Sequence, residues 1–217
     1  MSETAAGARG RSIRAVPPGG TEDRQHTEHG LERKQQLLDA AAELFADRGY
    51  GATRIVDICA AAGVAKGLFY WYFPTKSDLF VELVRTMRHR LRRAQGKAMA
   101  PDDDAPTRVA QGAAESVRFM AAHAGYFALL DVERADPEIA HVLDEGAGVY
   151  FSDVRRLVAE GQAAGTIPDG ETDLLTVGVL GAVSSFSNSF RNGRIDPTID
   201  VDALADFVAG WVARALR

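Results

Sequence analysis

The chain contains little cysteine and no long apolar run, and each shortage excludes a class of protein. Its single cysteine, Cys59, cannot form an internal disulfide framework. No run of about 18 or more apolar residues is present, so we expect no membrane-spanning helix. The first 30 residues also lack the continuous apolar stretch of a signal peptide. We therefore predict a cytoplasmic protein that does not enter a membrane.

The chain also lacks segments in which apolar and polar residues alternate, the pattern that indicates a half-buried strand. Apolar residues instead recur at helical spacing in every long segment, which predicts an all-α fold. A length of 217 residues with 46% hydrophobic residues is enough to bury a full core in one or two domains. After four helices in the first half, we expect a helical bundle, about nine helices in total, with the later ones at about 107–122, 125–134, 137–165, 172–192 and 201–216.

Charge is distributed unevenly along the chain. The net charge of −5 taken alone argues against a nucleic-acid partner. Residues 31–97, however, hold 12 Lys and Arg against 7 Asp and Glu, whereas residues 98–217 hold 9 against 19. A basic module beside an acidic one suits a protein with one end that approaches phosphates. The basic excess includes a run that is either a solvated helix face or a set of phosphate contacts: Arg85, Arg88, Arg90, Arg92 and Arg93.

Residues 53–76 read TRIVDICAAAGVAKGLFYWYFPTK and predict two short helices joined by a tight turn. The first helix has apolar residues at i, i+3, i+4 and i+7, on one face: Ile55, Ile58, Cys59 and Ala62. Gly63 then permits the left-handed conformation of a sharp turn. In the second helix Phe69 and Phe73 face inward, and Pro74 ends it. This arrangement is a helix-turn-helix, whose second helix fits a major groove.

Once its two phenylalanines are assigned to the interior, the second short helix still presents a cationic and aromatic surface. Lys66 lies in the first turn, where a positive charge opposes the helix dipole unless an anion lies beyond it. The hydroxyls of Tyr70 and Tyr72 can donate to phosphate oxygens, and Trp71 offers a large face to sugar or base edges. Any one of these aromatic residues could instead be core. The predicted DNA contacts are Thr53, Arg54, Ala65, Lys66, Gly67, Leu68, Tyr70, Trp71, Tyr72 and Lys76.

This segment resembles the DNA-binding domain of TetR-family transcriptional regulators. Residues 33–50 are similar to the family's first helix, and AAGV, a Tyr-x-Tyr-Phe ending and Lys-x-x-Leu follow in the family's order. The chain departs from the family at Ala65, where Ser is common, at Cys59, where Ala is usual, and at Arg54, where a small hydroxyl residue is usual. The resemblance implies a helix-turn-helix domain over residues 31–78 and a ligand-binding and dimerisation helical domain over residues 79–217.

The segment before that domain, residues 1–30, is rich in Gly, Arg, Glu, Thr and Pro, and we interpret it as a disordered tail. Its four arginines are balanced by four acidic residues, so its charge does not favour an additional DNA-binding arm.

The last two predicted helices hold more apolar residues than one buried stripe requires. A symmetric dimer would cover the second face, because two such helix pairs can meet as a four-helix bundle. The alternative is a thick monomer core. A dimer also suits DNA recognition, since two short helices can read a palindrome, and the family resemblance implies one. The predicted interface residues are Leu180, Val183, Phe207, Val208 and Trp211.

Aromatic residues in the bundle are candidates for an effector pocket, although each could equally be core. They are Phe119, His123, Tyr126, Phe127, Tyr150, Phe151, Phe186 and Phe190, with Met120 beside them. Such a lining is typical of an apolar small-molecule site. We therefore expect a hydrophobic or aromatic effector rather than an anionic one, and no cofactor or metal.

No catalytic constellation is evident. The GAGVYF segment at Gly146 follows no strand, so it is not a dinucleotide loop. Glu138 and His141 have the spacing of carboxylate-bundle metal ligands, but that chemistry needs a second such motif. We predict no enzyme, but a sequence-specific DNA-binding regulator, a repressor released from its operator by the effector. The alternative is an all-helical interaction protein whose helix-turn-helix is only structural.

Overall fold

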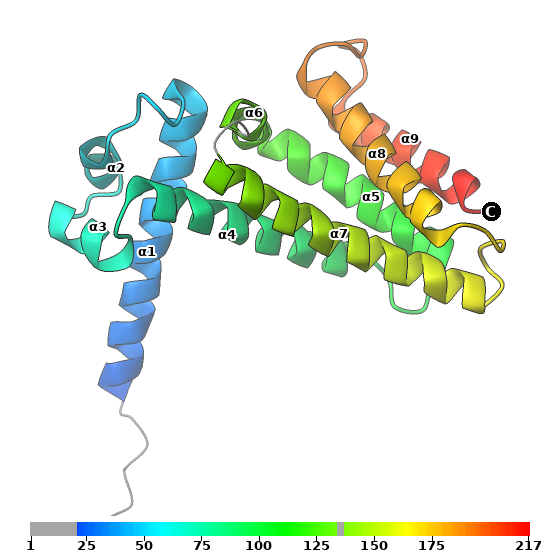
Figure 1. Cartoon of the computed structure of the whole chain (residues 1–217), viewed down its shortest axis with the longest axis horizontal. Helices are drawn as coiled ribbons and strands as arrows, with labels where there is room; N and C mark the ends of the chain where they lie inside the picture. The colour runs from blue at the N-terminus through cyan, green and yellow to red at the C-terminus, as the bar shows by residue number, and fades with distance from the viewer. Residues whose placement is uncertain (1–20, 134–136) are drawn as a thin grey trace, which may run out of the picture.

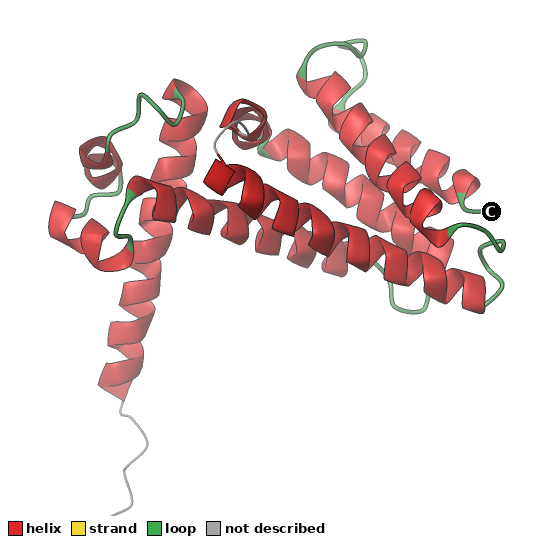
Figure 2. Ribbon diagram, viewed as in Figure 1, coloured by secondary structure: helices red, strands yellow, loops and turns green. Residues whose placement is uncertain are grey.

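The computed structural model of the chain describes residues 21–133 and 137–217 (Figure 1). These residues form nine α-helices and no strand (Figure 2), which confirms the predicted all-α fold. The helices are α1 (Thr21–Arg48), α2 (Ile55–Ala61), α3 (Lys66–Tyr72), α4 (Lys76–Ala98), α5 (Ala105–Ala122), α6 (Ala124–Glu133), α7 (Pro137–Ala163), α8 (Thr172–Arg191) and α9 (Val201–Ala215).

The first helix is longer than predicted. α1 begins at Thr21, so the interpretation as a disordered tail is wrong for residues 21–30. Those residues are mostly charged or polar and lack apolar periodicity, and a prediction based on a buried stripe does not detect such a segment. Residues 1–20, the rest of the predicted tail, lie outside the described residues.

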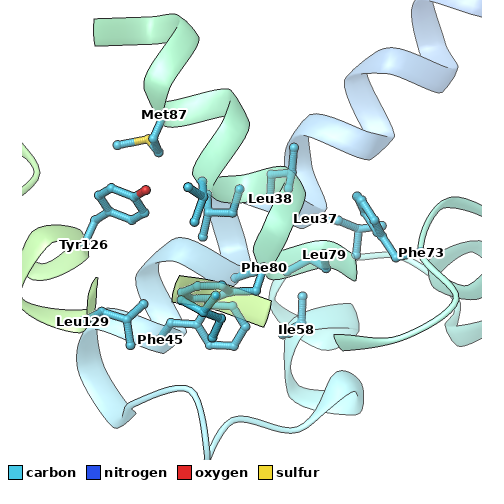
Figure 3. Packing of buried hydrophobic residues seen from close by; sticks show 14 of the residues in the cluster. Leu37, Leu38, Phe45, Ile58, Phe73, Leu79, Phe80, Met87, Tyr126 and Leu129 are labelled. Carbon is cyan, nitrogen blue, oxygen red and sulfur yellow. The ribbon is translucent and has the colours of Figure 1, made fainter. Parts of the chain in front are cut away.

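A cluster of large rings holds the first three helices against the beginning of α4. The ring centroids of Phe45, Tyr50 and Phe80 lie 5.1 to 5.7 Å from one another. Leu37 of α1 and Ile58 of α2 are buried in the same cluster (Figure 3). Because α2 and α3 have only seven residues each, this packing rather than helix propensity keeps them folded.

The two predicted domains, residues 31–78 and 79–217, pack against each other through this cluster. α4 places Leu79 and Phe80 in it, and then continues along α7 (Figure 1). α6 contributes Tyr126 and Leu129 to the same cluster (Figure 3). α6 also lies close to α1, since a Cβ added at Gly125 would stand 2.7 Å from Ala46 Cβ. The helix-turn-helix is therefore packed directly onto the following bundle.

A second hydrophobic cluster lies in the bundle and is built from smaller side chains. α5 packs most extensively against α9, with Ala113 of α5 and Ala205 of α9 both buried. α7 approaches closely at Gly161, where an added Cβ would stand 2.6 Å from Ile167 Cδ1 and 2.8 Å from Ala105 Cβ. Small residues thus allow the long helices to approach one another closely.

The helices also bear on the prediction about membranes. Within residues 21–133 and 137–217, no single helix has both the length and the apolar content to cross a bilayer. The pair α2 and α3 has sufficient length and apolar content only when the two helices are combined, and their axes are bent by 106° relative to each other.

Candidate DNA-binding interface

The helices α2 and α3 form the predicted helix-turn-helix. The 106° bend between them lies within the range of such motifs. Gly63 has a φ of 65°, the left-handed conformation that lets the chain leave α2 and turn at once. The Val64 amide donates to the Cys59 carbonyl oxygen at 3.0 Å and closes the turn. The turn therefore fixes the direction of α3.

The inward face of α3 is held by two phenylalanines. Phe69 is fully buried and Phe73 nearly so, with ring centroids 5.8 Å apart. The Phe73 amide donates to the Phe69 carbonyl oxygen at 2.8 Å and ends the helix. Cys59 lies in the same cluster, where burial raises the pKa of its thiol, so it is not a reactive thiolate.

The outward face of α3 exposes large side chains. Trp71 is 75% exposed and Tyr70 is 48% exposed, although both are large and partly apolar. Lys66 is exposed beside them, with its ammonium 5.7 Å from the Tyr70 ring centroid. Ala65 and Gly67 also lie on the surface, whereas the predicted contact Leu68 is half-buried and contributes less. The exposed face of α3 is therefore cationic and aromatic, as predicted.

Two predicted DNA contacts have hydroxyls that serve the fold instead. Thr53 is buried, and its Oγ1 donates to the Gly49 carbonyl oxygen at 2.8 Å, at the end of α1. The Tyr72 hydroxyl donates to the Gly30 carbonyl oxygen of α1 at 2.7 Å. Both side chains thus tie the helix-turn-helix to α1, and we remove them from the set of expected DNA contacts.

Lys76 also differs from its prediction as a free phosphate contact. Its ammonium donates to the carbonyl oxygens of Tyr50 at 2.7 Å and Thr53 at 2.9 Å. It also lies 4.2 Å from the Tyr50 ring centroid, in cation–π geometry. The charge is thus used to fix the loop between α1 and α2 against the start of α4, and Lys76 positions the motif.

Arg54 lies at the start of α2 with an exposed side chain. Its Nε and Nη2 each donate to the Asp57 carboxylate at 2.9 Å. This hydrogen-bonded pair raises the pKa of Arg54 and lowers the pKa of Asp57. A phosphate would have to compete with Asp57 for this guanidinium, so Arg54 is a weaker candidate than Lys66.

Comparison with known proteins places this motif in a family. Residues 37–83 match the family model described as "Bacterial regulatory proteins, tetR family". Residues 37–83 are therefore a TetR-type DNA-binding region. This confirms the resemblance seen in the sequence, and the relatives are transcriptional regulators rather than enzymes.

Two curated relatives match this chain over short segments. It is 42% identical over 60 residues to the HTH-type transcriptional regulator AcrR of Shigella flexneri, covering 28% of each chain. It is 45% identical over 53 residues to the HTH-type transcriptional repressor KstR2 of Rhodococcus jostii, covering 24% of this chain and 26% of the relative. The chain thus spans only about a quarter of the length of these relatives.

A solved structure extends the likeness to most of the fold. The regulator FadR from Bacillus subtilis, in complex with stearoyl-CoA, matches with a TM-score of 0.69 and 22% identity. The match covers 84% of this chain and 99% of that chain. At this identity the likeness concerns the fold, a helix-turn-helix followed by a helical domain.

The chain also contains a cavity of about 340 Å³ between α4, α5, α6, α7 and α8. Most of its wall is apolar, and each of the five helices contributes a polar group. The lining residues are Val84, Met87, Arg88, Leu91, Gln95, Ser116, Met120, Tyr126, Phe127, Leu130, Asp131, Val142, Leu143, Gly146, Ala147, Tyr150, Leu180, Val183, Ser184, Asn188 and Arg191.

Some of the predicted pocket residues line this cavity and others do not. Met120, Tyr126, Phe127 and Tyr150 line it. The remaining ones pack elsewhere: Phe119 stacks on His123 at 4.2 Å, Phe186 contacts Phe207 at 5.5 Å, Phe190 lines a separate cavity of about 230 Å³, and Phe151 is half-buried outside the lining. Aromatic character alone did not distinguish the two groups, because it does not show which face of a helix borders the cavity.

The sequence prediction missed the contribution of α4 to the cavity. Val84, Arg88, Leu91 and Gln95 line it, at successive turns of one helix face. Arg88 had been grouped with the basic run, but it lies on this face. Helical spacing from the buried Val84 could have separated Arg88 from its neighbours in the sequence.

The outer faces of α8 and α9 are apolar, but only part of the predicted dimer interface lies there. Phe207 is 53% exposed and Trp211 is also exposed. Val208 and Val183 are buried, so these two are corrected to interior positions, whereas Leu180 is half-buried and lines the cavity. The residues missed on the same surface are Leu174, which is 70% exposed, and Val177.

Proposed function

We propose that the protein is a DNA-binding transcriptional repressor that acts as a homodimer and is released from its operator by a small-molecule effector. The observation that carries this proposal is the outward face of α3. It leaves Trp71, Tyr70 and Lys66 exposed on a helix that is anchored by buried phenylalanines. A merely structural helix would gain nothing from exposing a tryptophan. Because the proposed partner is chromosomal DNA, we also propose that the protein acts in the cytoplasm.

The exposed residues divide into two roles. Lys66 supplies a charge for a phosphate, and the Tyr70 hydroxyl can donate to a neighbouring phosphate oxygen. Trp71 projects furthest and offers its face to base edges or thymine methyl groups in the major groove. Thr53, Tyr72 and Lys76 hold the motif in position through their contacts with backbone carbonyl oxygens.

The interaction surface for a second copy is the outer face of α8 and α9. Leu174, Val177, Phe207 and Trp211 expose large apolar side chains there. One α3 helix reads too few base pairs for specificity, whereas two related by a two-fold axis read a palindrome. Burial of these side chains in a dimer would give that symmetry. Phe207→Asp should convert the dimer to a monomer in sedimentation, while Arg194→Asp, on an exposed loop position, should not.

The cavity provides a route from effector to DNA because α4 belongs to both regions. Its first turns lie in the cluster that holds α1 to α3, and its later turns line the cavity. A ligand that favours one position of α4 would change the spacing of the two α3 helices in a dimer. A coupling free energy of about 1 to 3 kcal/mol changes DNA affinity by roughly 5- to 150-fold.

Two similar proteins bear on whether the effect on transcription is repression and on what the effector is. KstR2, which is similar over 53 residues, is a repressor. The solved FadR structure holds stearoyl-CoA. Both are properties of those proteins, and repression with release by a ligand is our proposal for this chain.

Salt dependence tests the DNA contacts. Duplexes would be selected from genomic fragments, and the affinity of a selected duplex measured by fluorescence anisotropy over a salt series. Log affinity should fall linearly with log salt, and Lys66→Ala should reduce the slope by about 0.9 because one phosphate contact is lost. Lys97→Ala, an exposed lysine at the far end of α4, is the control and should leave the slope unchanged.

Two results would contradict this assignment. A slope unaffected by Lys66→Ala would show that Lys66 does not contact phosphate. Failure to select any duplex would favour the alternative, an all-helical interaction protein whose helix-turn-helix is structural. Trp71→Ala should change which sequences are preferred, and an equal loss on all sequences would show that Trp71 does not read bases.

A further inference from the structure

The cavity contains a cation that its surroundings leave unsatisfied. Arg88 lines the wall on α4, and its Nη1 is buried without a hydrogen-bond partner among the described residues. Its side chain crosses α7 at Gly146, where an added Cβ would stand 3.7 Å from both Arg88 Cδ and Nη1. Arg88 as a whole is half-buried, but a polar atom closed off from water is ordinarily hydrogen-bonded. Among the described residues none supplies an anionic partner for this end of the guanidinium.

The other charged groups near the cavity are already engaged. Arg191 donates to Asn188 at 2.8 Å and pairs with Asp131. On α4 itself, Arg90 pairs with Asp39 at 2.9 Å and Arg92 with Asp153 at 2.8 Å, both outside the cavity. The contrast along one helix indicates that Arg88 is not simply one more solvated arginine of a basic run.

Two phenols lie in the electrostatic surroundings of Arg88. Burial raises the pKa of Tyr126 and Tyr150 far above the ordinary value, and the smaller opposing effect comes from the Arg88 charge. Both hydroxyls therefore remain protonated at neutral pH and can donate hydrogen bonds. The Tyr150 hydroxyl donates a long hydrogen bond of 3.5 Å to the Arg88 carbonyl oxygen, which places it next to this part of α4, and a ligand oxygen would have to replace that acceptor. Guanidinium and phenol donors together suit an acceptor-only group such as a carboxylate.

The rest of the wall specifies the body of the ligand. Met87, Leu91, Phe127 and Leu143 give an apolar surface, and the volume of about 340 Å³ lies at the low end for ligand sites. Asp131 and Arg191 at the wall pair with each other, so Arg88 is left to pair with one negative charge of a ligand. The lining thus fits a compact molecule with one anionic end.

We propose that the effector is a small apolar monocarboxylate whose carboxylate pairs with Arg88 while its hydrocarbon body fills the space between α4, α5, α6, α7 and α8. This inference rests on the proposed function, which assigns the cavity to the effector. It revises the sequence-based expectation of an uncharged hydrophobic effector. Because Arg88 is on α4, the pairing would act on the helix that carries the DNA-binding motif.

The test uses three probes of equal chain length and different charge: octanoate, octanamide and octylamine. Binding to the full chain would be measured by isothermal titration calorimetry. Octanoate should bind at least about tenfold more tightly than octanamide, a difference of about 1.4 kcal/mol, and octylamine should bind most weakly. In Arg88→Met, which keeps the aliphatic stem and removes the charge, octanoate should lose this advantage while octanamide binds as before.

The matched control is Arg93→Met, an exposed arginine of α4 outside the cavity, which should retain the wild-type preference. Arg88→Met should also unfold at the same temperature as the wild type or higher, because it removes an unpaired, partly buried charge. Should Arg88→Met fail to fold, Arg88→Gln provides the same comparison with a polar, uncharged side chain.

The outcomes separate this inference from the proposed function. Equal binding of octanoate and octanamide by the wild type, or a preference that survives Arg88→Met, would overturn the monocarboxylate assignment and leave an uncharged effector. If none of the three probes binds, the inference also fails. Probe binding is measured without DNA, so a wild-type chain that binds octanoate as expected but selects no duplex would count against the proposed function alone.

Discussion

The two hydrophobic clusters of the molecule solve different packing problems. The cluster around α1 to α4 contains six buried rings, whereas the buried residues of the bundle cluster include no aromatic residue. Short helices have little stability of their own, and large rings of fixed shape hold each one in place. Long helices need no such anchors, and Ala and Gly let them approach one another closely. The packing of the helix-turn-helix end thus depends on large rings, whereas the packing of the bundle depends on small side chains at the helix contacts.

The largest expected effect comes from removing a ring from the first cluster. Phe80→Ala deletes a fully buried side chain that contacts Phe45 and Tyr50, and should cost about 3 to 5 kcal/mol. The chain has two tryptophans, Trp71 and Trp211, one in each region. Urea unfolding followed in variants that keep only one tryptophan would show which region responds.

The comparison predicts that the Trp71 signal moves to lower urea in Phe80→Ala more than the Trp211 signal does. Val208→Ala is the matching substitution in the bundle cluster. It removes a smaller buried side chain, so it should shift both tryptophan signals less than Phe80→Ala does. Identical shifts of the two signals in Phe80→Ala would show that the clusters unfold as one unit.

A smaller effect is expected from adding bulk to the bundle. Gly161→Ala would place a methyl group 2.6 Å from Ile167 Cδ1, so we expect a loss of about 1 to 3 kcal/mol from overpacking. Gly148→Ala, in the same helix, meets no atom within 4 Å and should be neutral or stabilising by up to about 1 kcal/mol. The melting temperatures of both variants would be measured by thermal unfolding. Equal melting temperatures for Gly161→Ala and Gly148→Ala would show that close packing at Gly161 does not contribute to stability.

The smallest effect concerns the N-cap residue of α5 and depends on pH. Asp104 caps α5 by accepting the Thr107 amide, and hydrogen bonds from the Thr107 side chain and from this amide lower the pKa of its carboxyl group. A lowered pKa in the folded state means that this stabilisation is present above about pH 4 and is lost as pH falls further. Asp104→Asn keeps a capping oxygen but has no carboxyl group to protonate. The variant should therefore lose less stability than the wild type when the pH falls below about 4. An unchanged pH profile would show that the carboxylate charge is not needed.

Helix positions and the inward faces followed from local pattern. The spacing of Ile58 and Cys59, the turn at Gly63 and the burial of Phe69 depend on neighbours within a few residues, and the structure confirms them. The roles of Tyr72 and Lys76 did not follow, because their partners are carbonyl oxygens 42 and 23 to 26 residues away. No local pattern shows which side chain meets which distant backbone oxygen.

The same limit applies to the cavity. In the sequence Arg88 belongs to a basic run, but in the structure it lines the cavity wall. Neighbouring arginines on the same helix point to solvent, because successive residues of a helix lie on different faces. Leu180 and Val183 likewise share one helix with exposed apolar residues such as Val177, and only the packed bundle distinguishes them.

The sharing of one cluster by α4 and α6 has a consequence for hybrid regulators. A chimaera joined at residue 78 would separate Leu79 and Phe80 from the helices that they support, and would present Tyr126 and Leu129 to a foreign surface. Interchangeable parts must therefore carry their supporting helices with them. A helix-turn-helix unit transferred from this chain should therefore extend through α6. Gly125 should be retained, because it allows α6 to pack closely against Ala46 of α1.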